Sequence, residues 1–509
     1  MAETIDIIHE RAKLRRVLKR WDMVFFTACA IIGLDSVAPM AKWGLGQGLV
    51  WLFLFIFIYL LPYGLLTAEL GTTFPAEGGV YSWARMAYGK LAGGITAIFY
   101  WFSNAIWIGG TLAAVTIFAI NSLIVSKPLS LWPSVIIGLV FVWVNILLSV
   151  IALKHGKWAG NIGAGVKALT VVLFVILFAS YLGKHGVPKG VADAHSFVPS
   201  ATGFLAVAGT VIFLYVGFEL QSSASEEMTN AQRDVPLSIL RSGIMSAVLY
   251  GAVVVGMLLV LPVQQLQGLS GTASFTNAFA VINKELFGSG GAGKAMAYFC
   301  AIVIILTLVG SGSVWTLGSC RVQALAALDG AAPRWLGKFG KRGTPVVMAI
   351  ITGIVGSIFV IIVLGIYKGS VSAFFSVMLS LTLSTTMLAF IFTIPSIITL
   401  RRKFPNVHRP FRVPGGALGL WVCVILSEGC VIITVITMLW PGLLNNMLGQ
   451  SYSMEDNWGV GRGYFEAVTF GSVAVLVLIA IGLWLWGRAE TKGVEAGKDE
   501  LVAGVIQAK

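Results

Sequence analysis

Two short segments of this 509-residue chain place a carboxylate two residues after a glycine, each within a long apolar stretch. The first is Gly33-Leu34-Asp35, followed by Ser36, and the second is Gly217-Phe218-Glu219. A charge at bilayer depth costs about 2.5 kcal/mol or more and usually serves a function. Glycine-interrupted segments at matching places in two halves of a membrane protein indicate a transport site. We therefore expect Gly33, Leu34, Asp35, Ser36 and Gly217 to contribute to substrate binding.

Glu219 is the carboxyl group best suited to carry a proton. Burial disfavours the charged form of an acid, so this group could bind and release a proton as solvent access alternates. The alternative is an acid that is hydrogen-bonded in a structural role. Glu428 lies in a later apolar segment, and we expect it to be structural.

Asp35 has two alternative roles: it binds the substrate, or it forms an ion pair with Lys167. Asp35 could bind a substrate amine directly, because unit charges about 4 Å apart attract by a few kcal/mol at an effective dielectric constant near 20. It could instead pair with Lys167, which lies inside an apolar segment. Lys167 could also extend to the cytoplasmic edge of the membrane. As a buried ammonium group it could, finally, take part in proton coupling.

Aromatic side chains are candidates for the walls of the site. Trp315 follows the small-residue run 310–313, which would let two helices approach closely. It either fills that interface or walls a cavity, whereas Trp107 and Phe213 are weaker candidates, more typical of packing. A ring face would attract a substrate ammonium group by cation–π interaction.

The composition determines which elements must hold these residues. Hydrophobic residues make up 57% of the chain and charged residues 11%, against about 25% charged in soluble domains. The sequence therefore predicts an all-α integral membrane protein. A spanning helix needs about 20 apolar residues. Twelve segments meet this need, at 21–44, 47–71, 92–122, 130–153, 162–182, 203–228, 237–262, 292–325, 344–367, 371–399, 416–440 and 464–487.

The basic residues predict the orientation. With the N-terminus in the cytoplasm, 26 of the 35 Lys and Arg residues fall on the cytoplasmic side and 8 on the other, with Lys167 inside the fifth segment. This bias predicts a multi-pass protein of the cell membrane with both termini cytoplasmic. The net charge of +13 is then a topology signal, partly in contact with lipid headgroups, and predicts no nucleic-acid partner.

The segments divide into two halves of five. Because five is odd, the second half enters the membrane from the opposite side, which predicts an inverted-topology repeat with discontinuous helices one and six. The expected organisation is a cytoplasmic tail (1–20), a first repeat (21–182), a second repeat (203–399), two added helices (416–487) and a second cytoplasmic tail (488–509).

Other chemistry has no motif in the sequence. There is no phosphate-binding GxxxxGK[ST] loop, no HExxH and no His/Cys cluster at metal-ligand spacing. The five cysteines all fall in or beside apolar stretches and are expected to be free packing residues. We expect neither a cofactor nor a metal, and no enzyme activity. The expected partners are a small-molecule substrate, protons and the lipid bilayer; the oligomeric state is left open.

Three stretches resemble the amino acid–polyamine–organocation permeases. The loop after the second segment reads PAEGGVYSW from Pro75, similar to the Pro-Gly-Gly-Tyr signature of that family. The eighth segment and its exit read VWTLGSCRVQALAALDGAAP and continue to Gly343-Thr344-Pro345. The loop after the tenth segment ends PFRVPGG at Gly416. The stretch WTLGSCR also resembles the glutamate–GABA antiporter branch.

The resemblance implies a fold and several residue roles. The fold is that of the sodium-coupled leucine transporters, with segments one and six unwound at the substrate. Glu219 resembles the sixth-helix acid that family antiporters use in proton or pH sensing, and Lys167 the fifth-helix lysine that replaces a sodium ion. Trp315 and Phe213 resemble aromatic residues that contact and gate substrate in the arginine–agmatine antiporter.

One departure from the family pattern affects the choice of substrate. Most members have Gly-Ser-Gly in the first unwound stretch, where this chain has Gly33-Leu34-Asp35. An acid there favours cationic or decarboxylated amines over ordinary amino acids. We thus predict a secondary active transporter, proton-coupled or exchanging, for amino acids or organic amines. The alternatives are an acidic or neutral amino acid antiporter of the glutamate–GABA type and a substrate-sensing receptor on the same scaffold.

Overall fold

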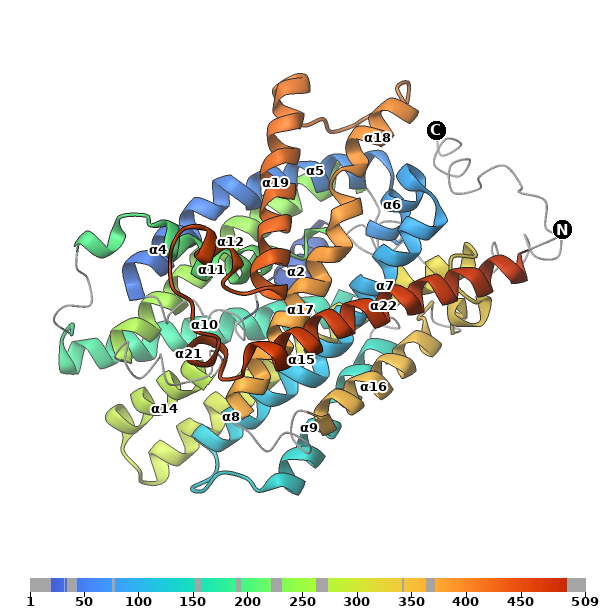
Figure 1. Ribbon diagram of the computed structural model, residues 1–509. Coiled ribbons are helices and arrows are strands. Elements are labelled where there is room, and N and C mark those ends of the chain that lie inside the picture. The colour runs from blue at the N-terminus through green and yellow to red at the C-terminus, as the bar shows by residue number, and fades with distance from the viewer. Residues whose placement is uncertain are drawn as a thin grey trace.

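A computed structural model describes residues 20–31, 33, 44–75, 78–151, 157–188, 194–220, 231–261, 273–340, 343–362 and 371–491. These residues form a bundle of helices without strands (Figure 1). The elements in chain order are α2 (Arg20–Ile31), α4 (Gly44–Phe55), η1 (Ile56–Leu60), α5 (Leu61–Thr73), α6 (Val80–Tyr88), α7 (Lys90–Ile106), η2 (Trp107–Leu112), α8 (Ala113–Leu123), α9 (Leu131–Ile151), α10 (Lys157–His185), η4 (Ala194–Phe197), α11 (Ala201–Leu214), α12 (Ala231–Val260), α14 (Ala273–Phe287), α15 (Gly291–Leu328), η6 (Arg334–Gly337), α16 (Val346–Ile361), α17 (Val371–Thr393), α18 (Ser396–Lys403), α19 (Gly416–Leu439), α20 (Leu443–Met447), α21 (Met454–Trp458) and α22 (Arg462–Glu490).

Within the described residues, 10 helices are long and apolar enough to cross a membrane. They coincide with ten of the twelve predicted segments. In the other two, 21–44 and 344–367, the described helices α2 and α16 have 12 and 16 residues. The chain is therefore an all-helical multi-pass membrane protein, and the count of twelve stays a prediction.

The spanning helices differ in how much of their surface is covered by protein. The spans Lys90–Leu123 and Phe375–Lys403 are 78% and 83% buried in their most apolar windows, so α7, α8 and α17 form the centre. The corresponding window of Arg462–Glu490 is only 17% buried. Helix α22 accordingly packs across the outside of the bundle, against α7 and α17 (Figure 1).

Small residues allow α10 and α15 to cross closely, as the sequence predicts for the run that begins at Gly310. A Cβ atom added to Gly310 would lie 3.0 Å from the Cα of Gly163, and one added to Gly163 would lie 2.5 Å from the Cys29 sulfur. Glycine at both positions thus brings α2, α10 and α15 together beside the predicted site. The five cysteines are free and buried, as predicted.

The first two family-like stretches contact each other. Tyr81, in α6, donates a 2.5 Å hydrogen bond to the Asp329 carboxylate, just beyond α15. Arg85 forms an ion pair with the same carboxylate, and Lys90 donates to the Asp329 carbonyl at 2.6 Å. Burial and the neighbouring carboxylate raise the pKa of Tyr81 well above its ordinary value, so its hydroxyl stays a hydrogen-bond donor. These contacts fasten α6 and the start of α7 to the end of α15.

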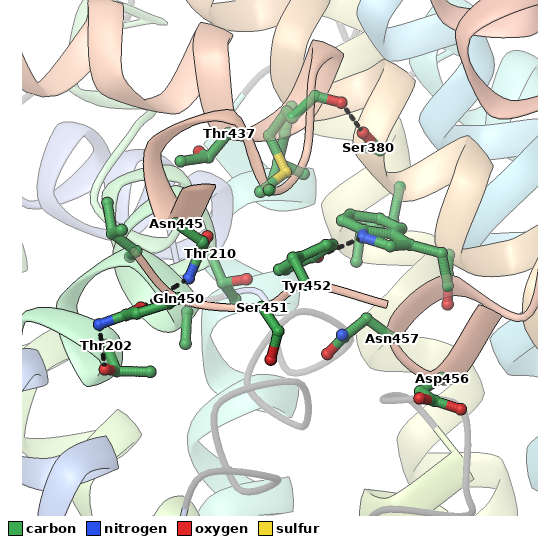
Figure 2. A pocket seen from close by; sticks show the side chains of 18 of the residues that line it. Thr202, Thr210, Ser380, Thr437, Asn445, Gln450, Ser451, Tyr452, Asp456 and Asn457 are labelled. Atoms are coloured by element: carbon green, nitrogen blue, oxygen red, sulfur yellow. Dashed lines mark hydrogen bonds between the residues drawn. The ribbon is translucent and has the colours of Figure 1, made fainter. Parts of the chain in front are cut away.

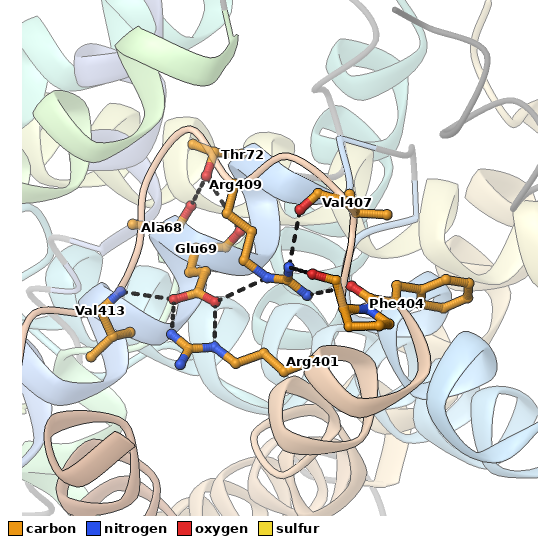
Figure 3. A network of polar contacts seen from close by, with 9 residues as sticks. Ala68, Glu69, Thr72, Arg401, Phe404, Val407, Arg409 and Val413 are labelled. Carbon is orange, nitrogen blue, oxygen red and sulfur yellow. Dashed lines mark hydrogen bonds and ion pairs between the residues drawn. The ribbon is translucent and has the colours of Figure 1, made fainter. Parts of the chain in front are cut away.

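The third stretch is fastened to α5 through Glu69, whose side chain is 2% exposed (Figure 3). Arg401 binds the Glu69 carboxylate with two hydrogen bonds, of 2.7 and 2.6 Å. The Val413 amide donates to it at 2.7 Å, and the Arg409 guanidinium lies 3.7 Å away. Burial lowers the pKa of Arg409 despite the attraction of Glu69, and its remaining donors bind loop carbonyls, including that of Phe404 at 2.8 Å. One buried acid therefore organises the loop between α18 and α19.

Candidate functional site

Two helices end at the predicted site, each just before one of the two glycines. Helix α2 ends at Ile31, and Gly33 is not helical. Helix α11 ends at Leu214, and Val216 and Gly217 form an irregular stretch before a single 3-10 turn at 218–220. Helix C-terminal ends leave backbone carbonyl oxygens without intrahelical partners and carry partial negative charge.

Tyr250, in α12, connects these two helix ends. Its hydroxyl group shares its proton between the carbonyl oxygens of Ile31 and Leu214, the latter at 3.2 Å. It also accepts a 2.8 Å hydrogen bond from the Gly33 amide. Tyr250 is fully buried. A displacement of either helix end must therefore break or rearrange a bond to the same hydroxyl group.

Three consecutive carbonyls at the end of α2 are capped by side chains from three different helices. Lys167, in α10, donates to the carbonyl of Cys29. The Trp315 indole, in α15, donates to the carbonyl of Ala30 at 3.0 Å. Tyr250 donates to Ile31, as described above. Side chains of three other helices thus bind the last carbonyl oxygens of α2, which have no partners within α2 itself.

Gly217 is required by both its backbone angle and its surroundings. Its φ of +126° lies in a region that side chains other than glycine rarely adopt. An added Cβ atom would lie 3.0 Å from the Ile31 side chain and 3.5 Å from the Trp315 ring. The predicted glycine therefore lies where α2, α11 and α15 meet.

Glu219 lies in this region with its side chain 2% exposed. Its carboxylate accepts hydrogen bonds from the hydroxyl groups of Tyr63 at 2.6 Å and Tyr100 at 2.8 Å, and from the Gly217 amide at 3.0 Å. All three donors are neutral, so none of them compensates the charge of the ionised carboxylate. Glu219 thus bonds both to the broken backbone and to two helices, α5 and α7.

Trp315 lies among other aromatic rings at this junction. Its ring centroid lies 5.9 Å from that of Tyr100 and 6.0 Å from that of Trp107, the latter in an edge-to-face arrangement. Trp107 begins the π-helical segment η2, and Tyr59 lies in the other one, η1. Such π-helical turns are rare and frequently occur at functional sites. Phe213 is only partly buried at the end of α11 and lies outside this aromatic group.

Lys167 is fully buried and bonded to α2, so it does not extend to the membrane edge. Its two other predicted roles remain open, because its predicted partner Asp35 lies outside the described residues, as do Leu34 and Ser36. The sequence did not single out Tyr63, Tyr100 or Tyr250. Each places a hydroxyl group in an apolar segment. This indicates that the hydroxyl has a polar partner, but not which residue that partner is.

A separate cavity of about 810 Å³ opens between α11, α17, α19 and the 440–458 loop (Figure 2). Its lining includes hydroxyl groups of Thr210, Ser380 and Thr437 and, as its one charged group among the described residues, Asp456. Gln450 ties the loop to α11 through a 2.8 Å hydrogen bond to Thr202. The cavity does not include Glu219 or Trp315, but α11 and α17 extend from it into the core beside them.

In the part of the chain that the structure describes, no three His, Cys, Asp or Glu side chains are grouped as metal ligands would be. Among the described residues, the polar groups at the ends of α2 and α11 include a carboxylate, tyrosine hydroxyls, backbone carbonyls and the ammonium group of Lys167. Such a set can bind a small polar or charged molecule and can move a proton.

Comparison with known proteins agrees with this reading. The amino acid permease family matches residues 18–454. The chain is 29% identical to a probable agmatine/putrescine antiporter of Lactococcus lactis, over 81% of this chain and 86% of that protein. It is 25% identical to a glutamate/gamma-aminobutyrate antiporter of the same species, over 71% and 72%. It is 24% identical to a branched-chain amino acid permease of Bacillus subtilis, over 87% and 94%.

These relatives are transporters and not enzymes, in agreement with the sequence prediction. The family match covers all three stretches that carry the sequence resemblance, together with both glycine–acid segments. Together with the multi-pass helical fold, it shows that this chain is a membrane transport protein that belongs to the amino acid permease family.

Proposed function

We propose that this chain is a secondary active transporter for organic amines, working by proton coupling or by exchange. The observation that carries the proposal is Glu219, a buried carboxylate with only neutral hydrogen-bond donors, at the C-terminal end of α11. Helix C-terminal ends and carboxylates both attract cations. The ring of Trp315 faces the same junction and can contribute cation–π attraction.

The first broken segment supports the same substrate class. Asp35 follows Gly33 by two residues, so a second carboxylate belongs to the segment that meets Glu219's helix at Tyr250. The relative named as a probable agmatine/putrescine antiporter, at 29% identity, is named for two amines. In this proposal Gly33, Leu34, Asp35 and Ser36 bind the substrate together with Gly217, Trp315 and Phe213.

Glu219 would couple protonation to the shape of the site. When ionised, it can accept all three of its hydrogen bonds. When protonated, it must donate one bond itself, so a tyrosine must turn or the Gly217 amide must be released. Since that amide belongs to the broken stretch of the sixth segment, a change of protonation would be transmitted to the backbone around the substrate. Lys167, bonded to the end of α2, would play the complementary role on the first segment.

We further propose the orientation and repeat expected from the sequence. Both termini would be cytoplasmic in the cell membrane, with twelve spanning helices and two inverted repeats of five. The Glu69 network and the Asp329 network would then lie on the cytoplasmic side, and the cavity of Figure 2 on the outer side. A reporter that is active only outside the cytoplasm, fused after Lys509, should give no signal; activity there would reverse the orientation.

A glutamate–GABA exchanger is the second candidate. It is favoured by the WTLGSCR stretch and by the 25% identity to a glutamate/gamma-aminobutyrate antiporter. The two candidates differ in whether the site accepts a carboxylate on the substrate.

Counterflow in proteoliposomes separates them. Vesicles loaded with unlabelled putrescine or agmatine should accumulate the labelled amine, while vesicles loaded with glutamate should accumulate little labelled GABA. The Trp315→Ala variant, reconstituted at equal protein density, provides the control for carrier-specific flux. Accumulation in the glutamate–GABA pair and none in the amine pairs would contradict the amine proposal and support the second candidate.

A further inference from the structure

A carboxyl group that the proposed function does not use lies inside a membrane-spanning helix, away from the proposed substrate site. Glu428 is in the middle of α19, a 24-residue spanning helix that runs from Gly416 to Leu439. Its Oε2 atom is buried and has no hydrogen-bond partner. A structural acid would be expected to have partners, because burying an unsatisfied carboxyl group costs several kcal/mol. The Oε2 atom therefore has no hydrogen bond that would explain the structural role expected from the sequence.

Two further buried polar groups near Glu428 also lack partners. The Ser427 hydroxyl precedes it in α19, and the Tyr59 hydroxyl comes from η1, which packs against α19. Both side chains are fully buried. Three unsatisfied polar groups on two packed elements are unusual, since most buried polar atoms are hydrogen-bonded. The π-helical turn that carries Tyr59 is itself a feature enriched at functional sites.

Tyr59 connects this region to the proposed proton site. Its ring stacks on that of Tyr63, with 5.2 Å between centroids and 6° between planes. The Tyr63 hydroxyl donates the 2.6 Å hydrogen bond to Glu219. The segment η1, which carries Tyr59, packs against α19, which carries Glu428. Glu219 and the helix that carries Glu428 are thus connected by two tyrosines on adjacent turns of one helical segment.

Few other titratable groups surround Glu428. Helices α11 and α17, which pack beside α19, have none in their described bounds. On α5, next to η1, the titratable groups are Tyr63 and Glu69, and Glu69 is bound by arginines at the helix end. On α19 itself they are Cys423 and Cys430. Helix α20 has none, and α22 meets the far end of α19 where Trp440 contacts Phe470.

We propose that Glu428 is a second proton-binding group of this transporter, coupled to Glu219 through Tyr59 and Tyr63. The proposal rests on the proton role of Glu219 proposed above. Glu428 Oε2 and the Tyr59 hydroxyl are not hydrogen-bonded to each other in the structure, so the coupling acts through the charge that Glu428 loses when it binds a proton. The Tyr59 hydroxyl, free of other bonds, can turn in response to either charge state of Glu428. Its orientation and the charge on Glu428 then change the potential at Tyr63 and Glu219.

The test is the pH profile of amine counterflow in proteoliposomes with equal pH on both sides. Glu428→Gln fixes this group in a neutral form. The number of protons inferred from the slope of the pH profile should fall by about one, and the midpoint of the profile should move by about half a pH unit or more. Tyr59→Phe keeps the stacked ring and removes only a hydroxyl without partners. Tyr59→Phe should leave the melting temperature unchanged yet move the midpoint of the pH profile. Combined with Glu428→Gln, it should cause no further shift of that midpoint.

The matched control is Glu466→Gln, the same chemical change at the start of α22, where Glu466 is partly exposed and pairs with Arg462 at 3.1 Å. It should leave the profile unchanged. If Glu428→Gln and Tyr59→Phe match this control while Glu219→Gln flattens the profile, the second proton site is refuted and the proposed function stands. If Glu219→Gln has no effect while Glu428→Gln does, the coupling and the proposed role of Glu219 both fail. A midpoint that follows sodium concentration in the unmodified protein but not in Glu428→Gln would identify a metal-ion site and overturn the proposal.

Discussion

The hydroxyl group of Tyr63 donates a 2.6 Å hydrogen bond to the carboxylate of Glu219, 156 residues away in the chain. Tyr63 lies in α5 and Glu219 in the turn after α11. The bond joins a continuous spanning segment to a broken one. It therefore connects Glu219, the proposed proton carrier, to α5. Through the stacked ring of Tyr59 it also connects Glu219 to η1.

Replacement of Glu219 by Gln should remove most of the pH dependence of transport while the protein still folds. Glutamine has nearly the same shape, can still accept from Tyr63 or Tyr100, and cannot ionise. The measurement is counterflow between pH 5 and 8, with melting of the purified protein as a check on folding. A pH profile identical to that of the unmodified protein would assign Glu219 a structural role.

Gly217→Ala should lower transport at least about tenfold, since strained backbone and a close contact are introduced together. The added Cβ would approach the Ile31 side chain to 3.0 Å at a φ of +126°. Gly482→Ala is the control, because a Cβ there meets nothing within 4 Å. Normal transport by the Gly217 variant would show that the broken stretch tolerates rearrangement and does not set the site.

Substitutions of Trp315 should separate binding from packing. Trp315→Ala should weaken amine binding about tenfold or more, whereas Trp315→Phe should retain part of the affinity, since it keeps a ring face and loses the 3.0 Å bond to Ala30. Binding of labelled substrate and thermal melting are measured together. Trp486→Ala, on the exposed face of α22, should change neither. A large loss of melting temperature with normal affinity would instead identify Trp315 as a packing residue.

Asp35→Asn should leave folding nearly intact, abolish transport of simple amines and relax the exclusion of carboxylates. This follows if Asp35 faces the substrate as an anion. If it instead pairs with buried Lys167, removing one partner costs about 3–5 kcal/mol, because the other charge is left without compensation. The measurement is a substrate panel combined with expression and melting. Misfolding of Asp35→Asn that is rescued by Lys167→Met would show the pair and contradict the amine-selecting role.

Arg401→Gln should destabilise the protein, because it leaves the buried Glu69 carboxylate without its two-bond partner. Arg409, 3.7 Å from that carboxylate, replaces only part of the lost interaction. We expect a melting temperature several degrees lower, with a smaller loss in Arg401→Lys. The neighbouring Arg402, which is exposed, provides the control as Arg402→Gln. Equal melting of both Gln variants would show that the network does not stabilise the loop.

Sequence alone was enough for the membrane class, most spanning segments, the family and the two glycine–acid positions. These depend on local properties: apolar runs of sufficient length, a helix-weakening residue, and motifs of adjacent residues. The close crossing at Gly310 could also be predicted, since small residues limit how near two backbones can come. The sequence allowed three roles for Lys167. Its burial excludes one of them, extension to the membrane edge.

The partners of the site residues depend on the tertiary structure. Nothing in the spacing of Tyr63, Tyr100 and Tyr250 indicates that two of them bind Glu219 and the third joins the ends of α2 and α11. Hydrogen bonds between distant segments are fixed by how the helices pack, and packing depends on many side chains at once. The sequence therefore determined which polar groups enter the membrane, whereas the fold decided which of them meet: Glu219 has three donors there, and the buried Oε2 atom of Glu428 has none.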